Sequence, residues 1–163
     1  MKITGYMTIL SALLTLLSGC KAKQPPKVAD LHFPVAVLFS NSSSVSYKDA
    51  ADLGVMHVNL IMMTDQSPAL IDSNFEIYTM DHLRSTHGGL WLMVHPSGNT
   101  EVEFTLLRAQ KSGLEAARAA MRAQLDKQTW RSDLDKQRAA LAAQTTLSGM
   151  LDVLRSEETS DGK

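Results

Sequence analysis

Four residues in the middle of the chain carry side chains suited to acid–base chemistry. Asp81, His82, Ser85 and His87 place a carboxylate, two imidazoles and a hydroxyl close together in the sequence. Groups of this kind hydrolyse esters and amides when they converge in space. No nucleophile elbow, glycine-rich phosphate loop or paired-carboxylate motif surrounds them. We therefore expect solvated or capping side chains in a loop, and a protein that is not an enzyme.

Histidine and methionine recur at close spacing in the same part of the chain. Met80 and His82 are two residues apart, as are Met93 and His95. In an extended strand, such residues point to the same face, and a thioether beside an imidazole suits Cu(I). However, no compact zinc or copper motif is present, and methionines on strands usually fill a core. Metal binding is therefore the second hypothesis. The first hypothesis, protein binding, requires no cofactor.

The single cysteine, Cys20, follows an N-terminal segment that has the form of a secretory signal. This segment starts with a lysine after the initiator methionine, is mostly apolar from Tyr6 to Leu17 and ends on two small residues. A helix that crosses a bilayer needs roughly 20 apolar residues. The segment is therefore too short to be a permanent membrane span.

The residues Leu17, Ser18, Gly19 and Cys20 resemble the lipobox of bacterial lipoproteins. The resemblance implies that residues 1–19 are a signal peptide, cleaved before Cys20. It also implies a diacylglyceryl group on the thiol and a fatty acid such as palmitate on the new amino terminus. Several acyl chains on one residue anchor a protein firmly. Residue 21 is lysine, not the aspartate that commonly marks inner-membrane retention, so the resemblance implies the outer membrane, facing the periplasm.

The rest of the chain divides into a tether, one domain and a tail. Residues 20–30 contain the lipidated cysteine and a lysine- and proline-containing tether with little to bury. Its lysines either contact anionic headgroups or are merely solvated. Residues 31–155 are long enough for a single domain with its own core, and residues 156–163 form a polar, flexible tail.

The first part of the domain shows the alternation of apolar and polar residues that predicts β-strands. Leu90–Val94 is apolar at every position, as in a strand covered on both faces, so Trp91 is expected in the core. Pro96–Asn99 supplies turn residues, and Trp91–Leu107 therefore predicts an antiparallel hairpin. The alternating sets are Phe33, Val35, Val37 and Phe39; Met56, Val58, Leu60 and Met62; Phe75 and Ile77; and Val102, Phe104 and Leu106.

The last part shows the 3.6-residue period of helices. We expect two helices, the second from near Trp130 to Leu154; one long helix bent near Thr129 is the alternative. The predicted fold is α+β, an antiparallel sheet of about four to five strands followed by two C-terminal helices packed on it. Two serine–acid pairs match the capping box at a helix start: Ser112 with Glu115, and Ser132 with Asp135.

Residues 30–107 contain nine acidic residues against two basic ones. This excess disfavours nucleic acid and favours a basic protein partner or a cation, although a solvated acidic surface is also consistent with it. Glu101 and Glu103 are candidate partner-binding residues on the expected hairpin. Trp130 and Arg131 are further candidates, because tryptophan and arginine are enriched at binding hot spots. For Trp130, closure of the helix junction onto the sheet is the interpretation that we favour over an exposed anchor.

The leading hypothesis is a lipid-anchored, periplasm-facing protein-binding module that acts as an envelope accessory factor, an inhibitor or an immunity-type lipoprotein. The alternative is a lipoprotein that binds metal through histidine and methionine. Convergence of the histidines in space would favour the metal.

Overall fold

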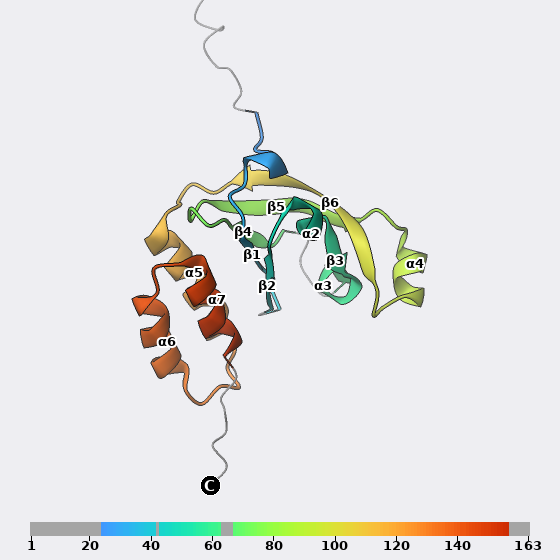
Figure 1. Ribbon diagram of the computed structural model, residues 1–163. Helices are drawn as coiled ribbons and strands as arrows, with labels where there is room; N and C mark the ends of the chain where they lie inside the picture. The colour runs from blue at the N-terminus through green and yellow to red at the C-terminus, as the bar shows by residue number, and fades with distance from the viewer. Residues whose placement is uncertain (1–23, 42, 63–66, 157–163) are drawn as a thin grey trace, which may run out of the picture.

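The chain alternates between strands and short helices as far as Arg108 and is helical from Leu114 onwards (Figure 1). The structure is a computed structural model that describes residues 24–41, 43–62 and 67–156. Within these ranges it is α+β, and its C-terminal helices pack on an antiparallel sheet, as predicted. Residues 1–19, predicted to be a signal peptide, lie outside the described residues, as do Cys20 and all of the tail beyond Ser156.

The sheet has six strands, more than the four to five predicted, in the order β2-β1-β4-β5-β6-β3. The long ribbon β5–β6 arches across the molecule (Figure 1). The outermost strands, β2 and β3, are consecutive in the sequence, and the short helix α2 between them places the buried Leu53 in the core. The strands are β1 (Val35–Leu38), β2 (Ser44–Tyr47), β3 (Val55–His57), β4 (Ala69–Ile71), β5 (Ile77–Ser85) and β6 (Asn99–Arg108).

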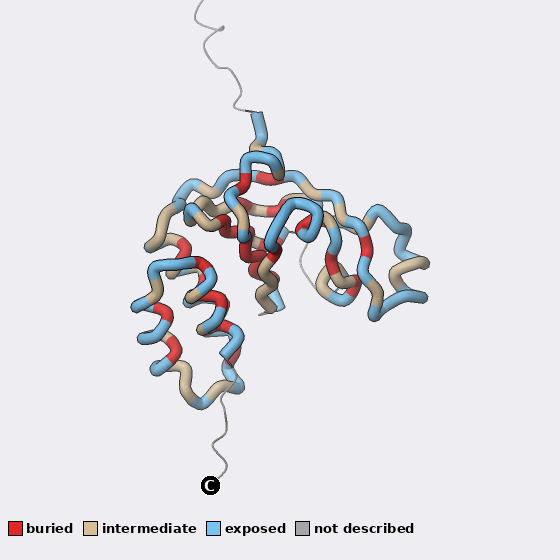
Figure 2. The backbone as a smooth tube through the Cα atoms, viewed as in Figure 1, coloured by how far each residue is buried: buried red, intermediate tan, exposed pale blue. Residues whose placement is uncertain are grey.

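Strand β1 lies between two hydrophobic cores and is buried at every position. Val35, Val37 and Phe39 face the core inside the curled sheet, whereas Ala36 and Leu38 face the C-terminal helices. Figure 2 shows buried residues in the central strands and in the helices that pack on them. The alternation predicted for this strand is therefore an alternation between two cores, and not between core and solvent.

The helical part contains three helices, and the predictions of two helices or one bent helix are both wrong. The segment predicted to be the second helix divides into two helices near Thr145. The Thr146 hydroxyl caps the last of these helices by accepting a hydrogen bond from the Gly149 amide at 3.2 Å. The bounds are η1 (Val28–Asp30), α2 (Ala50–Leu53), α3 (Val58–Met62), α4 (Gly89–Val94), α5 (Leu114–Asp126), α6 (Leu134–Ala143) and α7 (Leu147–Arg155).

Neither predicted capping box forms. Gly113, at a φ of 100°, is the N-cap of α5, and the Ser112 hydroxyl instead accepts from the Ile77 amide at 3.1 Å. Helix α6 has Asp133 at its N-cap without a capping hydrogen bond from that side chain. Ser112 therefore fastens the start of α5 to strand β5, and its role is tertiary.

Two segments predicted as strands are helical. The strand predicted from the alternation of Met56, Val58, Leu60 and Met62 ends with β3 at His57. The residues Val58–Met62 form the helix α3 instead. Leu90–Val94 lies in α4, which has no buried residue. The predicted hairpin is therefore wrong: β6 pairs with β5 on one side and with β3 on the other.

A buried carboxylate holds the turn between β4 and β5. Asp72 is completely buried. One of its oxygens accepts from the amides of Asn74 at 3.0 Å and Glu76 at 2.9 Å. The other accepts from the His32 amide at 3.2 Å, and the His32 Nδ1 lies 3.3 Å from it. Asp72 therefore joins this turn to the segment that precedes β1.

A buried amide joins the helices to the sheet. Gln124 of α5 is almost fully buried. Its Nε2 donates to the carbonyl oxygens of Phe39 and Ser43, each at 2.8 Å. These two carbonyls belong to the turn between β1 and β2, so the side chain fixes the position of α5 along the sheet.

Replacing Asp72 by alanine should lower the free energy of unfolding by about 3–5 kcal/mol, because it leaves three backbone amides without their acceptor. Asp49→Ala removes an exposed capping bond to the Asp52 amide and should cost about 1 kcal/mol. Urea unfolding of both variants measures the difference. Equal losses would show that the Asp72 carboxylate is not a buried acceptor.

Alkaline unfolding should depend on Tyr47. Burial, and secondly the charge of Asp52, raise the pKa of this phenol to about 12. An unfolded tyrosine ionises near pH 10, so the contribution is complete below about pH 10 and is lost as the pH rises to about 12. The loss is about 2–3 kcal/mol. Urea midpoints of the wild type and Tyr47→Phe should therefore converge or cross over this range. Parallel curves would contradict the raised pKa.

Candidate partner-binding surfaces

The residues predicted to bind a partner lie on two separate parts of the molecule. Glu101 and Glu103 are on β6, and Trp130 and Arg131 are in the turn between α5 and α6. Figure 1 shows the helical layer at one end of the arch and α4 at the other. The structure therefore does not unite the four candidates in one site, and α4 forms a third surface that the sequence did not reveal.

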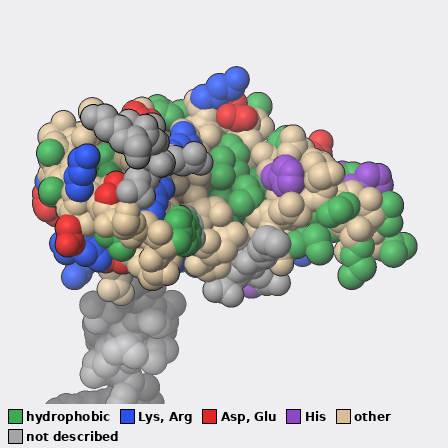
Figure 3. Space-filling view, turned by 90° about the horizontal axis from the view of Figure 1, so that it is seen from below, with side chains coloured by type: hydrophobic (Ala, Val, Ile, Leu, Met, Phe, Trp, Pro, Cys, Tyr) green, Lys and Arg blue, Asp and Glu red, His purple; other side chains and the backbone are tan. Residues whose placement is uncertain are grey.

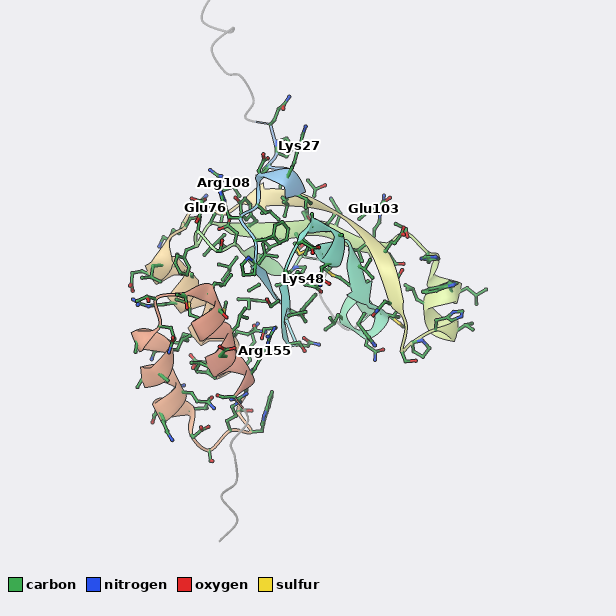
Figure 4. All side chains as sticks on the ribbon, viewed as in Figure 1. Lys27, Lys48, Glu76, Glu103, Arg108 and Arg155 are labelled. Carbon is green, nitrogen blue, oxygen red and sulfur yellow. The ribbon has the colours of Figure 1, made fainter. Side chains whose placement is uncertain are left out.

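The two glutamates are exposed on the outer face of β6, whereas Val102 and Leu106 point inward. The alternation predicted for this strand is confirmed. Glu103 accepts two hydrogen bonds through Oε2 from Arg84 of β5, at 3.2 Å from Nε and 3.0 Å from Nη2. In Figure 4, Glu103 lies on the arch away from the Glu76–Arg108 pair, which is 3.6 Å apart. The charge of Glu103 is thus already balanced by a neighbouring cation.

The turn between α5 and α6 presents an exposed aromatic side chain. Trp130 is 69% exposed, so the interpretation that it closes the junction onto the sheet is wrong. Its neighbour Arg131 donates from Nη2 to the Leu154 carbonyl at 2.8 Å and from Nη1 to the Ser156 carbonyl. These bonds satisfy carbonyls at the C-terminal end of α7. Arg131 therefore fixes the turn on which Trp130 stands.

A partly satisfied carboxylate lies at the same turn. Asp133 accepts from Gln137 Nε2 through Oδ2 at 3.1 Å. Its Oδ1 is buried and has no hydrogen-bond partner within the part of the chain that the structure describes. A buried carboxylate oxygen is out of reach of an external donor, so the exposed indole is the feature that this turn offers to a ligand.

The third surface is the connection between β5 and β6, residues 86–98, which we name the tip. Its helix α4 exposes 79% of Leu90, 70% of Met93 and 67% of Val94. Figure 3 shows hydrophobic side chains gathered at this end of the molecule, with histidine among them. Trp91, predicted to lie in the core, is instead half-buried at the surface.

Aromatic stacking positions the tip helix. The Trp91 ring lies between two imidazoles, with centroids 4.2 Å from His87 and 4.5 Å from His95 and interplanar angles of 24° and 20°. The Nδ1 of His87 is 3.0 Å from the hydroxyl of the buried Thr100, which is 2.6 Å from the Ser85 hydroxyl. These contacts fasten α4 to the ends of β5 and β6.

The four residues with acid–base side chains do not converge. Ser85 and His87 belong to the hydroxyl network at Thr100. Asp81 instead lies 3.3 Å from His82, between Oδ2 and Nε2. The β5–β6 register shifts between Asp81 and Arg84, and His82 has a φ of 53°. The arrangement therefore divides the four residues between a Ser85–Thr100–His87 network and a separate Asp81–His82 pair.

The two methionine–histidine pairs do not form ligand pairs. Met80 is completely buried, whereas the His82 side chain is 80% exposed, so the expectation that they share a face is wrong. Met93 is on α4 and His95 at its end, where residues two apart diverge. Among the described residues, no three histidine, cysteine or acidic side chains are placed to hold a metal ion.

Stability measurements should separate Trp130 from Arg131. Trp130→Ala should change the free energy of unfolding by no more than about 0.5 kcal/mol, because exposed side chains contribute little. Arg131→Ala should cost about 1–3 kcal/mol, because it removes charged donors from the end of α7. Urea unfolding of the two variants tests this difference. A large loss for Trp130→Ala would assign the indole to the interior.

No protein-family model matches the chain, and no curated protein or solved structure does either. Across the residues that the structure describes, no helix is long and apolar enough to span a membrane. Any function must therefore be argued from the geometry of these surfaces and from the N-terminal sequence.

Proposed function

We propose that the protein is a lipid-anchored, periplasm-facing module that binds another protein through Trp130 and the turn around it. The anchor rests on the resemblance of Leu17–Cys20 to a lipobox. The binding surface rests on one observation: an indole that is 69% exposed on a turn between two helices. The proposed class is an envelope accessory factor, an inhibitor or an immunity-type lipoprotein at the outer membrane.

The fixed turn supports binding because it reduces the entropic cost of association. Arg131 holds the turn against the end of α7 through two carbonyls, so little backbone has to be ordered when a partner docks. Preorganised aromatic side chains supply large contact areas with few rotatable bonds. Trp130 therefore has the properties expected of a central contact residue.

The acidic excess of residues 30–107 favours a basic partner. Around Trp130 the charges are mixed, and the carboxylate of Asp126 is already paired with Arg138 at 2.8 Å. A lysine or arginine of the partner placed over the exposed indole would gain a cation–π contact. Glu101 is exposed on the distant β6, and we assign it a role in steering the encounter.

The metal-binding alternative has weaker support. It requires at least three converging ligands, and the described histidines are distributed over the segment before β1, β3, β5 and the two ends of the tip. The imidazole rings of His87 and His95 both stack on the Trp91 indole. The two rings are therefore directed at the indole. Protein binding remains the proposal that the surface chemistry favours.

Site-specific photocrosslinking in the intact envelope tests the proposal. A photoreactive phenylalanine analogue at position 130 of the full chain should capture one protein. The same analogue at the exposed Thr145, in the loop between α6 and α7, should not. Cys20→Ser should abolish lipid attachment and the specific adduct, because lipoprotein processing requires the modified thiol.

Affinity measurements with the captured protein complete the test. Trp130→Ala should weaken binding by about 2 kcal/mol or more, roughly thirtyfold, whereas Thr145→Ala should leave it unchanged. Identical adducts at both positions, or equal affinities for wild type and Trp130→Ala, would refute binding at this turn.

A further inference from the structure

The tip differs in composition from the rest of the protein. Charged residues make up 20% of the chain, yet no aspartate, glutamate, lysine or arginine occurs from Thr86 to Thr100. Five apolar residues, Leu90–Val94, are consecutive within this segment. Their helix buries none of them. The tip therefore exposes apolar surface without the charged rim that normally keeps such surface in water.

The exposed side chains form one face of α4. Leu90, Met93 and Val94 have the i, i+3 and i+4 spacing that brings side chains together on a helix, and each is at least two-thirds exposed. Trp91 is instead stacked between the two imidazoles. A short helix with an apolar face and a tryptophan beside it suits the boundary between water and lipid.

The opposite end of the same ribbon receives the N-terminal segment. Val28 packs against the core inside the sheet, and Pro25 and Pro26 line shallow pockets together with Leu106 and Leu107 of β6. Figure 1 shows this segment over the β5–β6 ribbon and α4 at the far end. Only four residues link Cys20 to Gln24, where the described structure begins, and they span at most about 14 Å. A lipid on Cys20 would thus hold the β5–β6 ribbon close to the bilayer, and the tip, at the far end of the same ribbon, can tilt onto that bilayer.

We infer that the tip inserts the Leu90, Met93 and Val94 side chains into the interface of the bilayer that holds the anchor, which makes a second, reversible membrane contact. The inference rests on the anchor in the proposed function. Tethering raises the effective concentration of the tip at the bilayer, so a weak contact is populated. The two contacts orient the domain with α5–α7 and Trp130 directed away from the lipid.

Lipid suits the tip better than a protein groove does. Protein interfaces obtain their specificity from polar and charged groups around an apolar centre, and the side chains of the tip offer only two imidazoles, two small hydroxyl groups and the indole N–H of Trp91. The exposed Glu101, at the adjoining end of β6, disfavours anionic lipid. The surface therefore fits a bilayer rich in zwitterionic headgroups.

The two tryptophans of the chain provide an internal control for the experiment. The full lipidated protein is reconstituted into phosphatidylethanolamine–phosphatidylcholine vesicles that carry bromine near the top of the acyl chains, and floated to confirm attachment. In Trp130→Phe, the fluorescence of Trp91 should be quenched at least twofold. In Trp91→Phe, the fluorescence of Trp130 should be unchanged. Adding Leu90→Ser and Met93→Ser to Trp130→Phe should abolish the quenching.

Each other outcome contradicts a defined part of the inference. Protein that does not float refutes the anchor and, with it, the tip contact. Protein that floats without preferential quenching of Trp91 refutes the tip contact alone and leaves binding at Trp130 intact. If Trp91 is not quenched and a photoreactive residue at Leu90 captures a protein or a second copy of the chain, the occupant of the tip is that protein.

Discussion

The fold depends on the short link between the two edges of the sheet. Strands β2 and β3 lie at opposite ends of the strand order, yet only Lys48–Gly54 separates them in the sequence. With α2 helical, this link spans at most about 20 Å, whereas six flat strands at ~4.8 Å spacing are about 24 Å wide. The sheet must therefore curl, and the interior that this creates is filled by Leu53, Tyr47 and their neighbours.

Curling leaves only part of the outer surface for the helices. Helices α5–α7 pack on β1, β4 and the start of β5, and polar links set their position: Gln124 holds the turn after β1, and Ser112 holds the start of β5. The far half of the β5–β6 ribbon remains without helical cover. The tip is the consequence, because it extends beyond both cores.

Sequence patterns predicted the class of the fold. They also predicted the strands whose alternate residues face different surroundings. The alternation in β6 and in β1 corresponds to real strands because each contacts a core with one or both faces. The run Leu90–Val94 was misread because a short apolar segment fits a buried strand or an exposed helix equally well. The surroundings of Trp91 favour the helix, because it brings the indole between the histidines at both ends of the tip.

The remaining errors have similar causes. Ser112 has the sequence of a cap, but a strand amide competes for its hydroxyl. The break before α7 follows from the Thr146 cap, a signal present in the sequence but weaker than the leucine period that crosses it. For the candidate site, residue type indicated Trp130, but its exposure depends on Arg131 reaching the end of α7. Such long-range contacts are not visible in local patterns.

The absence of any buried residue in α4 has a consequence for the lifetime of the molecule. A segment that contributes nothing to the cores can open without the cost of global unfolding, so its opening equilibrium is set by local contacts alone. Proteolysis proceeds through such open states in proportion to their population. The stack on Trp91 therefore protects the backbone at this end of the ribbon, and turnover of the protein can be governed there while both cores remain folded.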